Sequence, residues 1–296
     1  MSKTIILICV FLILGVIAYF ILPRGEERIT SYKGLDVDLT IDSAIATKIE
    51  IQKPGKSIII ENLDGKWTIT SPGRYSANGS TVAQMLGGLK KFKVGSLISS
   101  NPQKQNMFQV DSTGTMLTVA DRTGKTISMV IGKMGPSYSD LYFRLPNSND
   151  VYLGEGITTW ILNQELKDWR DKTIFSTTSD SIRQLSFAYK AKNFVLQRDS
   201  ASWKYGTLVL DNAVISGALN TLSSLQAEDF IDSVINPSHQ PISVNIQTSN
   251  SVTIDFFPQQ PDSAKFTVRT SGSPQVYQVN KWTVQQILKP IESYIK

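Results

Sequence analysis

The chain has 296 residues, of which 41% are hydrophobic and 19% are charged. This balance is typical of a folded globular protein, so it excludes a chain that is disordered throughout. The formal net charge of +5 is a mild excess, which favours solubility and gives no basic footprint for a nucleic-acid partner.

The first predicted element is a membrane anchor. Residues 4–22 read TIILICVFLILGVIAYFIL and contain no charged residue. As a helix that rises about 1.5 Å per residue, this run spans close to the roughly 30 Å hydrocarbon core of a bilayer. A cleaved signal peptide is the alternative, since Val16-Ile17-Ala18 resembles a cleavage site, but the apolar run continues beyond it to Leu22. We therefore predict an uncleaved signal anchor over residues 1–24, followed by a linker over 25–42.

The first half of the chain then carries three hairpin signals and one helix signal. Strand-like alternation flanks turn sequences at Asp64-Gly65, at Arg122–Lys125 and between residues 145 and 150. Asn78 is placed to cap a helix. The apolar face of that helix would carry Val82, Met85, Leu86 and Leu89. A second helix, from about Ile157 to Arg170, is predicted to close the unit.

The second half repeats this order at a nearly constant spacing. Asp211 stands 133 positions after Asn78, and Val276-Tyr277 stands 125 positions after Val151-Tyr152. A closing helix that contains Ile287-Leu288 is predicted to end the copy. Landmarks that recur in the same order, with drifts of a few residues, indicate one unit present twice.

These elements predict an α+β protein with an N-terminal transmembrane helix and two similar units. Each unit consists mainly of antiparallel hairpins, with a mid-unit helix and a closing helix. The first unit is predicted over residues 43–175 and the second over 176–296, and both fall within the usual size range of domains. Hairpin signals outnumber strand-helix-strand alternation, which disfavours a doubly wound parallel sheet.

The densest mixed-charge stretch, ELKDWRDKTIF at residues 165–175, falls between the two predicted units. It would form the end of the first closing helix and the link into the second unit. We interpret it as a joint that also serves in docking. Its candidate partner-docking residues are Trp169, Arg170, Asp171 and Lys172.

The sharpest basic cluster follows the mid-unit helix of the first unit and consists of Lys90, Lys91 and Lys93. Lysines at a helix C-terminus complement the helix dipole, which is sufficient as a structural explanation. Their counterparts in the second unit are Ser223, Ser224 and Gln226, so the unit does not need the charges in order to fold. The three lysines are therefore candidates for docking an acidic partner or anionic lipid headgroups.

Signatures of catalysis or metal binding are weak. His239 is the only histidine, and no Gly-x-Ser-x-Gly nucleophile elbow occurs. The single cysteine, Cys9, lies in the apolar run, so the folded part has no thiol for a disulfide, a zinc site or a nucleophile. The sequence DRTGKT at 121–126 lacks the glycine spacing of a phosphate loop and reads as a hairpin turn. We predict no catalytic, cofactor-binding or metal-binding residue, and no cofactor.

Four segments together carry a family resemblance. They are the apolar N-terminal run, GKWTI at 65–69, FQVDSTGTMLTV at 108–119 and DWRDKTIF at 168–175. On these segments the chain resembles the domain of unknown function 4340 family. It departs from that family's pattern at Ser112-Thr113, where the pattern places a proline. The resemblance implies a membrane-anchored extracytoplasmic protein, often associated with ABC-transporter components of the gliding-motility type, and it brings no catalytic residues.

We therefore expect a non-enzymatic, single-pass accessory protein of the inner (cytoplasmic) membrane, with the bulk of the chain outside the cytoplasm. Its expected partners are the bilayer and the subunits of a transporter-type complex. The alternative is an extracytoplasmic binding module for a small ligand or a cell-wall polymer, with the site in the groove between the two units.

Overall fold

The computed structural model of the protein describes residues 35, 37–200, 202–232, 240–259 and 264–295. The predicted anchor over residues 1–24 lies outside the described residues, as do most of the predicted linker and His239. In the part of the chain that is described, no helix combines the length and the apolar character that a membrane span requires.

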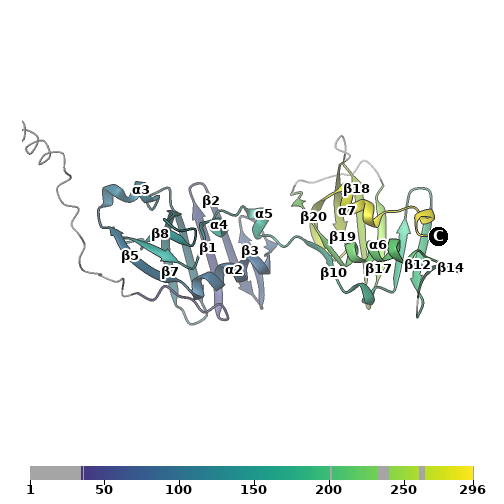
Figure 1. The fold of residues 1–296 in the computed structure, drawn as a ribbon, viewed down its shortest axis with the longest axis horizontal. Helices are drawn as coiled ribbons and strands as arrows, with labels where there is room; N and C mark the ends of the chain where they lie inside the picture. Colours follow the sequence, from purple (N-terminus) through teal and green to yellow (C-terminus); the bar gives the residue numbers. More distant parts are fainter. Residues whose placement is uncertain (1–34, 36, 201, 233–239, 260–263, 296) are drawn as a thin grey trace, which may run out of the picture.

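Strands dominate the fold, with 46% of the residues in strands and 21% in helices. The prediction of an α+β fold is therefore wrong: the protein is mostly antiparallel β, arranged in two large sheets (Figure 1). The predicted closing helices are only one or two turns long, whereas each sheet joins all of its hairpins into a single nine-stranded layer. The sequence prediction rests on local helix signals. The sheet contacts join hairpins that are distant in the chain, and no local pattern displays them.

The first sheet has the strand order β4-β3-β2-β1-β6-β7-β8-β9-β5, and all neighbouring strands are antiparallel. Its strands are β1 (Ala46–Lys53), β2 (Lys56–Leu63), β3 (Lys66–Ser71), β4 (Tyr75–Ser76), β5 (Lys93–Ser99), β6 (Thr115–Asp121), β7 (Thr126–Met134), β8 (Asp140–Arg144) and β9 (Val151–Glu155). The three predicted hairpin turns join β2 to β3, β6 to β7 and β8 to β9. The DRTGKT segment is the β6–β7 turn, in which the Asp121 carboxylate accepts hydrogen bonds from the backbone N–H groups of Thr123 and Lys125.

Helix α2 (Gly79–Lys90) follows β4 at one edge of this sheet and precedes β5 at the other edge. Asn78 caps the helix, because its side-chain oxygen accepts hydrogen bonds from the backbone N–H groups of Ser80 and Thr81 at 3.0 and 3.3 Å. The buried residues of the helix are the four that the sequence predicts, Val82, Met85, Leu86 and Leu89. This amphipathic face attaches the helix to the first core.

The second sheet has the same strand order as the first, β14-β13-β12-β11-β17-β18-β19-β20-β16. Its strands are β11 (Gln184–Ala188), β12 (Asn193–Arg198), β13 (Trp203–Tyr205), β14 (Leu208–Val209), β16 (Asp229–Phe230), β17 (Ile242–Gln247), β18 (Ser251–Pro258), β19 (Lys265–Thr270) and β20 (Ser273–Asn280). Helix α6 (Asn212–Ser223) takes the place of α2 and is capped by Asp211 in the way that Asn78 caps α2. The sequence spacing of 133 residues therefore separates two residues, Asn78 and Asp211, that occupy equivalent positions in the two units.

The closing segments differ most from the prediction. The helix expected from Ile157 to Arg170 consists of two separate single turns, α4 (Thr159–Leu162) and α5 (Leu166–Trp169). In the second half, α7 (Lys281–Ile287) ends before Leu288 and is followed by the 3₁₀ turn η3 (Ile291–Ser293). The remaining short elements are η1 (Pro102–Lys104), α3 (Gln105–Phe108) and η2 (Ser179–Ser181). In the second half Pro290 follows the end of α7 and cannot continue the helix.

In the described part of the chain, each sheet has one large hydrophobic core, and a small cluster of Val110, Val130 and Val151 adds to the first unit. The first large core ends in sequence at Trp169, and the second begins at Ile174. Ile174 belongs to β10 (Thr173–Ser176), which pairs with β15 (Ser224–Gln226) beside the second sheet. The change from one core to the other therefore takes place within the four residues 170–173.

Two adjacent glycines of α2 test this packing. A Cβ added at Gly88 would overlap the backbone oxygen of Gly156, whereas a Cβ at Gly87 would meet no atom within 4 Å. We expect Gly88→Ala to lower the free energy of unfolding by about 1–3 kcal/mol through overpacking. The matched control Gly87→Ala should raise it by about 0.5–1 kcal/mol through helix propensity. Urea unfolding measures both, and equal effects of the two variants would contradict the packing of α2 against the β9–α4 loop.

Candidate functional site

The joint between the two sheets is formed by a chain segment that pairs first with one unit and then with the other. At its start, the backbone N–H of Asn78 donates to the carbonyl of Trp169 at 2.7 Å, and that of Asp171 donates to the carbonyl of Ser76 at 2.9 Å. At its end, the N–H of Ala227 donates to the carbonyl of Lys172 at 2.8 Å, next to the β10–β15 pair. Figure 1 shows this segment as the connection between the two sheets.

Trp169 is fully buried in the first core. Its backbone contact to Asn78 has a counterpart in the second unit, where the N–H of Asp211 donates to the carbonyl of Tyr294 at 2.8 Å. Tyr294 is fully buried as well. Trp169 and Tyr294 therefore close the two units in the same way.

Arg170 is the feature that the second unit does not repeat. The short antiparallel bridge that it forms with Ala77 is matched by a bridge between Leu210 and Ile295. An apolar side chain thus stands at the second position where the first has a guanidinium. The Arg170 side chain is only 3% exposed, so a permanent charge is buried at the joint.

Aromatic rings from both units stack on the buried guanidinium. Its central carbon lies 3.8 Å from the ring centroid of Tyr75, which belongs to β4 at the edge of the first sheet. It lies 3.7 Å from the ring centroid of Phe230, which belongs to β16 at the edge of the second sheet. The planar cation therefore fills the space between β4, at an edge of the first sheet, and β16, at an edge of the second. Because water is excluded from this space, the cation–π attraction is stronger than at an exposed site.

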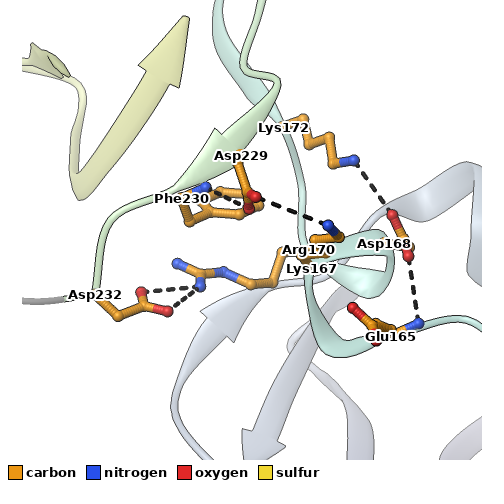
Figure 2. Close-up of polar contacts among 8 residues, drawn as sticks. All are labelled: Glu165, Lys167, Asp168, Arg170, Lys172, Asp229, Phe230 and Asp232. Atoms are coloured by element: carbon orange, nitrogen blue, oxygen red, sulfur yellow. Dashed lines mark hydrogen bonds and ion pairs between the residues drawn. The ribbon is translucent and has the colours of Figure 1, made fainter. Parts of the chain in front are cut away.

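The side-chain hydrogen bonds of Arg170 all reach the second unit, and Figure 2 shows the pair with Asp232. One terminal nitrogen donates to both carboxylate oxygens of Asp232 at 2.9 and 2.8 Å, and the other donates to the side-chain oxygen of Gln275 at 3.0 Å. Among the described residues, the third nitrogen, Nε, has no hydrogen-bond partner. Because Asp232 is 56% exposed, solvent screens the ion pair, and the stacked rings supply the better-desolvated part of the contact.

The other charged residues of the joint are closer to solvent. Lys167 lies 3.8 Å from Asp229 across the joint, with both side chains more than 40% exposed. Lys172 lies 3.4 Å from Asp168 within the same segment, and the Asp171 carboxylate accepts a hydrogen bond from the backbone N–H of Thr173 at 2.9 Å. These contacts shape the turn and contribute little to stability individually.

The predicted basic cluster lies at the other end of helix α2. Lys90, Lys91 and Lys93 are all exposed, and Lys90 is 3.8 Å from Asp42. Lys91 and Lys93 line a shallow cavity of about 440 Å³ together with Glu155 and Ser139. Because α2 is 12 residues long, roughly 18 Å of helix separates this cluster from the joint. The seven predicted docking residues therefore form two groups and not one surface.

Burial divides these seven residues further. Trp169 and Arg170 are buried, so their side chains take part in packing within and between the units. The three lysines of the basic cluster remain open to solvent. Their role in docking stays a prediction.

Sequence reasoning missed the residues that surround Arg170. Tyr75, Phe230, Asp232 and Gln275 come from positions up to 105 residues away in the chain. A signal was present at Phe230, which replaces the aliphatic residue found at the equivalent position of the first unit, Leu97. In the described part of the chain, no group of three or more His, Cys, Asp or Glu residues is arranged to hold a metal ion.

Substitutions across the joint test the contribution of Arg170. We expect Arg170→Met to lower the free energy of unfolding by about 2–3 kcal/mol, because the stacked cation and its three hydrogen bonds are lost. Arg170→Lys should be nearly as damaging, since an ammonium cannot stack as a planar group. Lys167→Met is the matched control across the same joint and should cost less than about 0.5 kcal/mol. Urea unfolding followed by tryptophan fluorescence measures these losses, and equal values for Arg170→Met and Lys167→Met would contradict the assignment.

Comparison with known proteins places the chain in a family. A protein-family model described as a domain of unknown function (DUF4340) matches residues 67–243, which is more than half of the chain. No curated protein matches the chain. No solved structure matches it either. The chain therefore belongs to the DUF4340 family, as the sequence resemblance predicted.

Proposed function

We propose that the protein is a non-enzymatic accessory subunit that holds two matched β units in one relative orientation for a membrane complex. The single observation that supports this most strongly is the buried Arg170, which contacts both units and has no equivalent at the end of the second unit. A permanent charge is costly to bury, so its presence at the joint favours a role that requires a defined arrangement of the two sheets.

Two further parts of the proposal rest on the sequence. The uncharged run at residues 4–22 has the length of a single membrane anchor, which would tether the units outside the cytoplasm at the inner membrane. The association with an ABC-transporter-type complex rests on what the family resemblance implies. The described residues supply a candidate docking surface in Lys90, Lys91 and Lys93, whose exposed ammonium groups suit an acidic partner.

The alternative function, ligand binding in the groove between the units, has less support. Trp169 is buried in the first core, so its ring does not offer a stacking surface to a sugar or polymer. The space between β4 and β16 is occupied by Arg170 and the rings of Tyr75 and Phe230. We therefore favour binding of a partner protein over binding of a small ligand as the function.

Crosslinking in intact cells, followed by purification of the full-length chain from detergent-solubilised membranes, tests the proposal. We expect the wild type to recover transporter-type membrane subunits reproducibly. Charge reversal of Lys90, Lys91 and Lys93 to Glu should reduce that recovery about tenfold, because a charged surface selects its partner by complementarity.

A matched control reverses three exposed lysines elsewhere, Lys66, Lys190 and Lys281, and should leave recovery unchanged. Recovery of the protein alone, despite efficient crosslinking, would contradict membership of a stable complex. Equal losses in the two triple variants would contradict the basic cluster as the docking surface.

A further inference from the structure

A second, separate cavity lies in the first unit, where the ends of several strands meet α4. It has a volume of about 320 Å³, and the residues that line it include Lys53, Gln109, Thr115, Lys133, Thr159 and Asn163. They come from the end of β1, the loop after α3, the start of β6, the end of β7 and the α4 turn. Neither the joint nor the basic cluster contributes a residue to it.

Lys53 carries a positive charge that the described residues do not balance. Its ammonium donates to the side-chain oxygen of Asn163 at 2.9 Å, a neutral partner 110 residues away in the chain. In the described part of the protein, no carboxylate forms an ion pair with it or lines the cavity. Partial burial, together with the neighbouring Lys56, lowers the pKa of Lys53. An anion in the cavity would relieve both effects.

Lys133 is a second lysine among the residues that line the cavity. In the structure its ammonium nitrogen lies 6.0 Å from the centroid of the Tyr142 ring, and the side chain is exposed. Because the oxygen of the Asn163 amide accepts from Lys53, the NH₂ group of that amide is left to donate to a ligand. Thr115 and Thr159 line the cavity as well. Lysine, amide and hydroxyl side chains around one cavity are the donor types that suit the oxygens of a doubly charged phosphate.

The wall of the cavity is held by close backbone packing. Gly132 of β7 lies against the end of α3 so closely that a Cβ there would overlap the carbonyl oxygen of Phe108. The next residue, Gln109, is the left-handed C-cap of α3 with a φ of 57°, and its backbone N–H donates to the carbonyl of Asn106 at 3.1 Å. The end of α3 and strand β7 therefore fix this wall of the cavity.

From this arrangement we propose that the cavity binds a small phosphate monoester, with Lys53, Lys133 and Asn163 as its principal ligands. The volume lies at the lower end of the range for small-molecule sites, and it exceeds the needs of a phosphate group, which leaves room for a short alcohol portion. This site is independent of the accessory role proposed above, because it shares no residue with the joint or the basic cluster.

Calorimetric titration of the full-length protein in detergent tests the site, with glycerol 3-phosphate and inorganic phosphate as probes. Sodium chloride and sodium sulfate at matched ionic strength serve as controls for non-specific charge effects. We expect glycerol 3-phosphate to bind at one site per chain and to raise the melting temperature by mass action. Tighter binding of the ester than of inorganic phosphate would identify an organic phosphate as the ligand, and equal binding would identify free phosphate.

Lys53→Met should weaken binding of glycerol 3-phosphate by about tenfold or more, since it removes a charged hydrogen-bond donor. Lys133→Met and Asn163→Ala should weaken it as well, and they keep the test decisive if Lys53→Met does not fold. Lys66→Met is the matched control, because Lys66 is exposed and begins β3, at the β2–β3 turn and so at the other end of β2 from the β1–β2 turn beside Lys53. Equal affinities of Lys53→Met and Lys66→Met would overturn the proposal. Absence of phosphate binding to the wild type, or equal heats with sulfate, would overturn it too.

Discussion

The burial of one guanidinium group between two aromatic rings is the interaction on which the arrangement of the two units depends. Each sheet has its own core and its own capped helix, so folding of each unit is explained by contacts within it. Those contacts do not determine the relative position of the two sheets, because the backbone crosses between them in only four residues. Arg170 provides a directional contact at that crossing, with Tyr75 on one side and Phe230 on the other.

Comparison of the two copies shows which features belong to the unit and which to the joint. Both copies place a helix cap, a closing backbone hydrogen bond and a buried aromatic residue at equivalent positions. The first copy alone has an arginine after the buried aromatic residue and lysines after the mid-unit helix. Features that one copy lacks are not required by the fold, and this is why the joint and the basic cluster are the candidates for function.

The repeat, the hairpin turns and the caps could be predicted from the sequence because each depends on residues close together in the chain. Asn78 and Asp211 are examples, since a cap needs only its own side chain and the next three residues. The extent of the first closing helix was predicted wrongly, since residues 163–165 separate two single turns, α4 and α5. The partners of Arg170 were missed because they lie up to 105 residues away in the chain. The charged stretch coincides with the crossing from the first sheet to the second, whereas burial of Trp169 and Arg170 is a property of the assembled sheets.

Arg170 is proposed to fix the two units in one orientation. Pulsed electron–electron double resonance, which measures the distance between two spin labels, tests this most directly. Spin labels would be placed at Lys66→Cys in the first sheet and Lys190→Cys in the second, with Cys9→Ser to remove the native thiol; both lysines are exposed. We predict one narrow distance distribution, which broadens when Arg170→Met is added. A broad distribution in the parent protein, or one that Arg170→Met leaves unchanged, would contradict the account.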